Sequence, residues 1–134
     1  MGYTNIGEAK QIADFARLFF NKNVLEAGFG YTTIELARVI ENFTVMDIED
    51  KEVPKGARFI KGDATKADLS GLEGIIAIGL GTELANDFAK NGASYRVQKA
   101  IFSPPLTKPK ELGYEQIGQT MIGEKIVQAY KLIQ

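Results

Sequence analysis

Apolar side chains follow two spacings along the chain, one typical of helices and one typical of short buried strands. In residues 5–20 the apolar positions fall on one helix face, whereas residues 75–80 form a short run that is almost entirely apolar. The predicted helices are residues 5–20, 32–41, 83–90 and 114–132. The predicted strands are residues 24–27, 43–46, 58–60, 75–80 and 95–102.

This alternation of helices and strands predicts an α/β fold with a mostly parallel sheet covered on both faces. We expect a three-layer sandwich with about five strands in the order 3-2-1-4-5. The sequence contains no linker-like segment, so residues 1–134 are expected to form one domain. The fifth strand, residues 95–102, would lie at the sheet edge, which must be covered or paired. We therefore expect a homodimer or a partner subunit.

Composition narrows the chemistry that the protein can perform. The 134 residues include 16 basic and 17 acidic side chains and neither His nor Cys. This excludes thiolate metal sites, Cys nucleophiles, Ser-His-Asp hydrolysis and imidazole acid–base catalysis. The near-neutral charge gives no support for nucleic-acid binding. No apolar run is long enough to span a bilayer and no signal-peptide pattern is present, so a cytoplasmic protein is expected.

A glycine turn between the first strand and the second helix is the most informative motif. In Glu26-Ala27-Gly28-Phe29-Gly30, the first glycine permits a tight turn and the second lets a ligand approach the backbone. Thr33 stands where a dinucleotide fingerprint would have its third small residue. The glycines alone are therefore equally compatible with ordinary turn chemistry.

Two carboxylates follow the next two predicted strands. Asp47 ends the second strand and could accept hydrogen bonds from both ribose hydroxyls of an adenosine. Asp63 ends the third strand and could accept a hydrogen bond from an adenine amine, while the backbone at Ala64 could form a hydrogen bond with a ring nitrogen. Either carboxylate alone is more often a cap or a solvated loop acid. Together with the glycine turn, they would converge at the carboxyl edge of the sheet, where open α/β sheets bind ligands.

Glu26 lies inside the first strand, where an unpaired carboxylate is costly to bury. One interpretation is that it accepts from the ammonium group of an amino-acid ligand, directly or through water. The other is that it caps and ties down the glycine loop. The sequence favours neither.

The segments Glu26-Ala27-Gly28-Phe29-Gly30, Asp47 and Gly62-Asp63-Ala64 resemble the Rossmann-like superfamily of S-adenosylmethionine (SAM)-dependent methyltransferases. The resemblance covers about residues 23–80. The loop from Asp47 through Pro54 to Asp63 is also similar to a small uncharacterised family of archaeal methyltransferase-like proteins. The resemblance implies SAM as the cofactor and implies that Glu26, Gly28, Gly30, Asp47 and Asp63 contact it. Against the seven strands common in that superfamily, the predicted sheet would be truncated.

Candidate substrate contacts follow the fourth and fifth predicted strands. Gly79 and Gly81 could let a ligand approach the backbone or could form a tight turn. Ser103, in Ser103-Pro104-Pro105, could orient a substrate, but such a segment more often terminates a strand. The acidic cluster around Asp47 lacks the ligand spacing of a cation site, so no metal is expected.

The sequence thus supports two main hypotheses. The first is a minimal SAM-dependent methyltransferase for an unknown small or macromolecular acceptor. The second is a non-catalytic SAM- or nucleotide-binding interaction module with a degenerate Rossmann fold. Methyl transfer depends mainly on positioning an already activated group, so the absence of His is compatible with the first.

Overall fold

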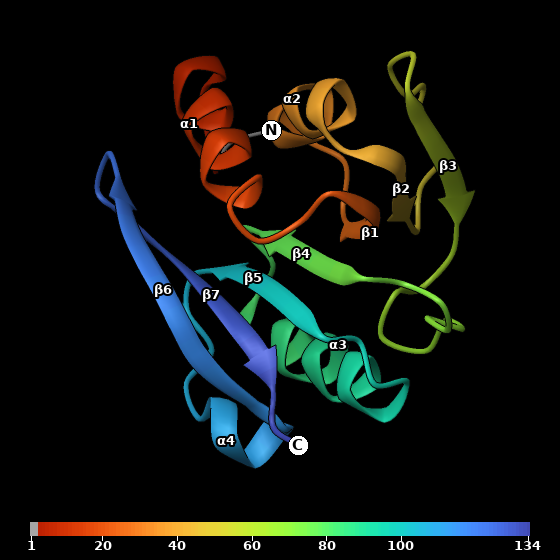
Figure 1. Cartoon of the computed structure of the whole chain (residues 1–134). Coiled ribbons are helices and arrows are strands. Elements are labelled where there is room, and N and C mark those ends of the chain that lie inside the picture. The colour runs from red at the N-terminus through yellow and green to blue at the C-terminus, as the bar shows by residue number, and fades with distance from the viewer. Residues whose placement is uncertain (1–2) are drawn as a thin grey trace.

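A computed structural model describes residues 3–134, which form one mixed seven-stranded sheet and four helices (Figure 1). The strand order is β3-β2-β1-β4-β5-β7-β6. The strands are β1 (Lys22–Ala27), β2 (Glu41–Asp47), β3 (Ala57–Lys61), β4 (Gly74–Ile78), β5 (Lys99–Ser103), β6 (Tyr114–Ile122) and β7 (Lys125–Leu132). The helices are α1 (Ile6–Ala16), α2 (Tyr31–Val39), α3 (Thr82–Ser94) and α4 (Pro109–Leu112).

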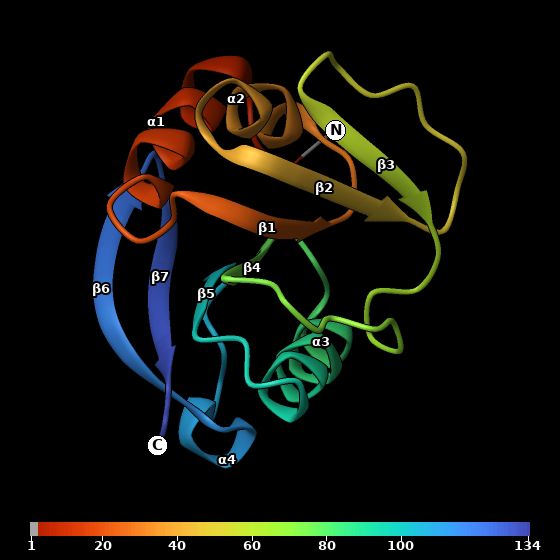
Figure 2. The same ribbon diagram turned by 45° about the vertical axis from the view of Figure 1, so that its right-hand side comes forward.

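The expected α/β architecture and the expected order of the first five strands are confirmed. Strands β1 to β5 are parallel. Strand β1 lies between β2 and β4 and pairs with both. Helices α1 and α2 cover one face of the sheet and α3 covers the other, as Figure 2 shows. Each face has its own apolar core, one around Ile12, Leu36 and Phe43 and the other around Ile75, Phe88 and Phe102. Because β1 to β5 run parallel, their carboxyl ends lie at the same edge of the sheet.

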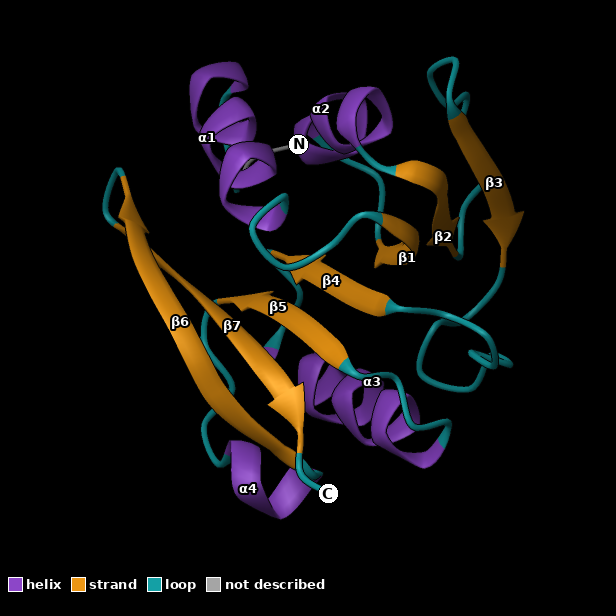
Figure 3. Cartoon of the chain, in the orientation of Figure 1, coloured by secondary structure: helices purple, strands orange, loops and turns teal. Residues whose placement is uncertain are grey.

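The prediction of a truncated, five-stranded and mostly parallel sheet is wrong, because residues 114–132 form a hairpin and not a helix (Figure 3). The face of the predicted helix would contain Ile117, Met121, Ile126 and Tyr130, but the first three side chains are exposed and only Tyr130 is buried. Gly123 and Glu124 join the two strands, and Gly123 has a φ of +62°. A glycine at the first position of a two-residue turn suits a β-hairpin.

The hairpin also changes the position of β5 in the sheet. Strand β7 pairs antiparallel with β5, so β5 lies inside the sheet and β6 forms the edge. The expectation that the fifth strand is an open edge is wrong. The observed strand begins at Lys99 and not at residue 95, because α3 continues past the predicted end at residue 90 and stops at Ser94. A Cβ at Gly92 would lie 2.6 Å from Ile75 Cδ1, so this glycine permits close packing of α3 on the sheet.

Within residues 3–134, no helix has both the length and the apolar character needed to cross a membrane. In the same part of the chain, no cluster of three or more Asp or Glu side chains could hold a metal ion.

Candidate functional site

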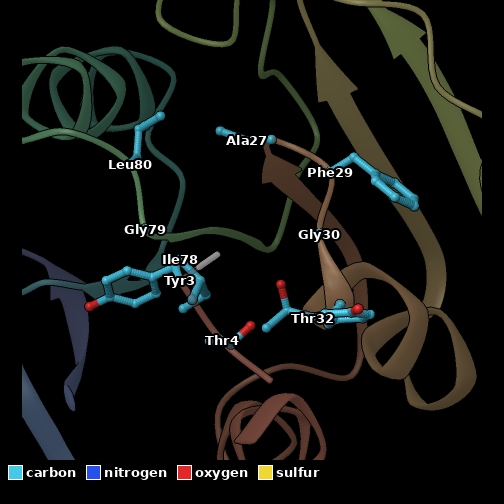
Figure 4. A pocket seen from close by; sticks show the side chains of 11 residues that line it. Tyr3, Thr4, Ala27, Phe29, Gly30, Thr32, Ile78, Gly79 and Leu80 are labelled. Carbon is cyan, nitrogen blue, oxygen red and sulfur yellow. The ribbon is translucent and has the colours of Figure 1, made fainter. Parts of the chain in front are cut away.

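Two adjoining pockets open at the carboxyl ends of the parallel strands and share Ala27, Gly28 and Leu80. The first, of about 250 Å³, is here called the glycine-turn pocket. Its walls are residues of the N-terminal segment, the glycine turn and the end of β4, shown in Figure 4: Tyr3, Thr4, Ala27, Gly28, Phe29, Gly30, Tyr31, Thr32, Ile78, Gly79 and Leu80.

The second pocket, of about 360 Å³, is here called the carboxylate pocket. It is lined by residues at or just after the ends of β1 to β4 and by one residue of α3: Ala27, Gly28, Met46, Asp47, Ile48, Gly62, Asp63, Ala64, Thr65, Leu80 and Leu84. Its surface is largely apolar, and Ile48 and Leu84 are 72% and 49% exposed. Exposed apolar side chains beside two carboxylates suit a flat ring that carries hydrogen-bonding groups at its edge.

The glycine turn presents backbone to both pockets. Gly28 has a φ of +90°, a conformation that favours glycine, and its N–H donates to the carbonyl of Met46 at 2.8 Å. A Cβ at Gly28 or Gly30 would meet no atom within 4 Å, so open space lies in front of both residues. A ligand could therefore approach the main chain at the start of α2, as predicted.

Asp47 fixes the turn through its two carboxylate oxygens. Oδ2 accepts from the N–H of Phe29 and Oδ1 from the N–H of Glu49, both at 3.0 Å. A carboxylate has about four lone-pair positions, so capacity for a ligand hydroxyl is left. The side chain thus joins the end of β2 to the glycine turn and also lines the carboxylate pocket.

Asp63 shapes the loop after β3. Its Oδ1 accepts from both the N–H and the hydroxyl of Thr65, and these hydrogen bonds hold the pKa of the Asp63 carboxyl below its usual value. Asn91 Nδ2, on α3, donates to the carbonyls of Ala64 and Ala67 at 3.0 and 2.9 Å. Asp63 is therefore ionised and set in a supported loop at the pocket wall.

Glu26 lies behind the glycine turn and is only 1% exposed. Its oxygens accept from the hydroxyls of Thr32 and Thr33, and the Thr33 hydroxyl also accepts from the N–H of Gly30 at 3.0 Å. Burial raises the pKa of Glu26 to about 7, against the lowering effect of the two threonines. The geometry is that of a loop cap, and Thr32 stands between Glu26 and the glycine-turn pocket.

Of the three candidate substrate contacts, Gly79, Gly81 and Ser103, only Gly79 lines one of the two pockets. Gly79 lines the glycine-turn pocket, whereas Gly81 precedes α3 and lines neither pocket. Ser103 is 1% exposed, and its hydroxyl donates to the carbonyl of Ile126 at 2.7 Å. The Ser103 hydroxyl also contacts the Tyr3 hydroxyl at 2.9 Å, so both of its neighbours are protein groups.

Sequence reasoning missed the apolar walls and the contribution of the N-terminal segment. Ile48 directly follows β2 and Leu80 lies two residues after β4, so an apolar residue just after a strand is a signal that could have identified them. Nothing in the sequence indicated that Tyr3 and Thr4 reach the site, because this depends on how α1 packs.

Comparison with protein-family models and with curated proteins finds no match. Magnesium protoporphyrin IX methyltransferase (ChlM) from Synechocystis PCC 6803, with bound SAM, has a TM-score of 0.69 at 14% identity. The match covers 96% of this chain and 78% of that chain. Ribosomal protein L11 methylase from Lactobacillus delbrueckii subsp. bulgaricus has a TM-score of 0.70 at 16% identity, covering 95% and 78%.

A mutant of MtNAS in complex with S-adenosylmethionine has a TM-score of 0.71 at 17% identity. The match covers 93% of this chain but only 60% of that chain. At such identities the likeness establishes the fold and leaves the ligand and the reaction to other evidence. The protein therefore has the Rossmann-like fold found in methyltransferases.

Proposed function

We propose that the protein binds S-adenosylmethionine across the two pockets and transfers its methyl group to an acceptor. The observation that carries this proposal is that two carboxylates and a glycine turn meet at one sheet edge, around two pockets that share Ala27, Gly28 and Leu80. The ligand-bound ChlM and MtNAS structures, which have the same fold, support the choice of cofactor.

The adenosine part of the ligand is assigned to the carboxylate pocket. Asp47 would accept from the ribose hydroxyls, Asp63 from the adenine amine, and Ile48 and Leu84 would cover the apolar ring. The amino-acid part is assigned to the glycine-turn pocket, where Thr32 lies in front of the buried Glu26 carboxyl. A negative diphosphate is less suited to this end, because a partly ionised carboxyl lies beneath the start of α2.

Bound SAM supplies a methyl group whose bond to sulfur breaks as a lone pair of the acceptor forms a bond to the carbon. The residues that line the two pockets have to position the donor and exclude water, which can provide much of the rate of such a reaction. Among the residues that line the glycine-turn pocket, Tyr3 and Tyr31 alone carry ionisable side chains. We therefore propose an acceptor that needs no strong protein base.

A calorimetric titration with SAM, S-adenosylhomocysteine (SAH) and NAD tests the cofactor assignment. We expect SAM and SAH to bind with a Kd of roughly 1–100 μM, the lower part of the range that is typical of KM values, and NAD to bind much more weakly. Equal or tighter binding of NAD would contradict the proposal, as would the absence of binding by all three.

The non-catalytic alternative differs only in the fate of the methyl group. Release of SAH from SAM in the presence of candidate acceptors supports the enzyme, whereas binding without turnover by any acceptor favours a binding module. A homodimer or a partner subunit stays a prediction, which sedimentation over a range of concentrations tests.

A further inference from the structure

Residues 3–5, here called the N-terminal strap, run across the end of β4 and form one wall of the glycine-turn pocket. Tyr3 and Thr4 line the pocket, and Tyr3 lies on the side opposite Gly30, as Figure 4 shows. Gly79 has a φ of +85°, and a Cβ there would lie 2.7 Å from the Cβ and Cγ of Tyr3. The strap is thus in direct contact with the backbone of the pocket floor.

The side chain of Tyr3 extends away from the pocket and anchors the strap. Ser103 donates its only hydroxyl proton to the carbonyl of Ile126, so the Tyr3 hydroxyl must donate in its 2.9 Å contact with Ser103 Oγ. The Tyr3 ring also faces Lys125, whose Nζ lies 5.4 Å from the ring centroid, within the range of a cation–π interaction.

Lys125 makes a second connection to the same region. Its Nζ donates to Glu8 Oε1 at 2.8 Å, and the two side chains are 22% and 16% exposed. Glu8 in turn accepts from the N–H of Asn5 and donates its own N–H to Asn5 Oδ1, so it fixes the end of the strap. Lys125 and Ile126, adjacent residues at the start of β7, therefore hold both ends of the strap.

We propose that the C-terminal hairpin locks the N-terminal strap against Gly79, and that Tyr3 and Lys125 are positioning residues for the ligand in the glycine-turn pocket. This inference rests on the proposed function for the identity of that ligand. It gives the β6–β7 hairpin a role in the site although no residue of the hairpin lines either pocket. If the lock opens, the fraction of protein with a complete pocket falls, and the apparent affinity falls by the same factor.

Lys125→Ala tests the lock, with Lys131→Ala as the matched control. Lys131 lies on the same strand and forms an ion pair with Glu115 at 3.2 Å, away from both pockets. We expect Lys125→Ala to weaken SAH binding about threefold to tenfold through the lost fraction of closed protein. Lys131→Ala should bind SAH like the unmodified protein, and Lys125→Arg should restore most of the affinity, since arginine can make both contacts.

Hydrogen exchange of the ligand-free variants provides a readout that does not depend on SAH. Amides of residues 4–8 should exchange faster in Lys125→Ala than in Lys131→Ala, while the thermal midpoints of the two variants stay similar. Unchanged exchange or unchanged SAH affinity in Lys125→Ala would overturn the inference and leave the proposed function intact. Absence of SAH binding by the unmodified protein would instead overturn the proposed function, and the exchange result would then decide whether the lock exists.

Discussion

The free energy of unfolding of Glu26→Gln, relative to that of the natural protein, should rise by about 3 kcal/mol as the pH rises from about 4 to about 8. The Glu26 carboxyl is buried, and burial raises its pKa from 4.5 to about 7. In the unfolded chain the same group ionises near its ordinary pKa of 4.5. Between these two values the folded state binds more protons than the unfolded state.

The sign of the effect follows from this difference in bound protons. The contribution of Glu26 to stability is fully present below pH 4.5 and is lost as the pH rises through about 7. A neutral glutamine keeps a hydrogen-bonding partner for the threonines and does not titrate. Denaturant unfolding of both proteins across this pH range measures the difference at each pH.

The two proteins serve as their own control at low pH, where both side chains at position 26 are neutral. Their difference in unfolding free energy should therefore change only above pH 4.5. Parallel stability curves over the whole range would mean that Glu26 keeps its ordinary pKa, and would contradict the buried loop cap. A carboxyl kept at such a cost beside a pocket is typical of functional sites.

Asp47→Asn should weaken SAH binding about tenfold to 150-fold, which corresponds to roughly 1.5–3 kcal/mol for hydrogen bonds to a charged acceptor. The amide keeps one oxygen for the N–H of Phe29 or Glu49, so the turn should survive. It loses the charge and the second acceptor that we assign to the ribose hydroxyls. Calorimetric titration with SAH measures the loss.

Asp68→Asn is the matched control for this change. Asp68 caps a similar turn, accepting from the N–H and hydroxyl of Ser70, but it lines neither pocket. It should bind SAH like the unmodified protein. Equal losses in both variants would indicate a general effect of carboxyl removal, and no loss in Asp47→Asn would remove Asp47 from the binding site.

The sequence was informative where local chemistry determines the structure. Gly28 needs its positive φ, and Asp47 and Asp63 follow strands whose parallel pairing brings their ends together. The alternation of strands and helices predicts the parallel sheet and the convergence of these residues. The strand order 3-2-1-4-5 belongs to the Rossmann-like fold that the sequence resembles. Glu26 could not be assigned, because its role depends on the two threonines that reach back to it from α2.

Residues 114–132 could not be assigned by spacing, because the apolar residues at 117, 121, 126 and 130 fit one face of a helix. In the hairpin the first three are exposed, whereas Tyr130 is buried. The deciding contacts are distant in sequence. A Cβ at Gly118 would lie 2.8 Å from the Phe19 ring, and Tyr114 donates to the carbonyl of Val97 at 2.8 Å. The Gly123-Glu124 pair between two β-rich runs was the available local signal for a hairpin.

An amide chemical-shift titration of the isotope-labelled protein with SAH shows directly whether one ligand occupies both pockets. We expect perturbations at both pockets together, at the glycine turn, at Asp47 and Ile48, at residues 63–65 and at Gly79 and Leu80. A single ligand bridging the two pockets requires all four segments to titrate with one Kd. Perturbations confined to another surface, such as the groove between α3 and α4 around Asn86 and Lys108, would contradict it.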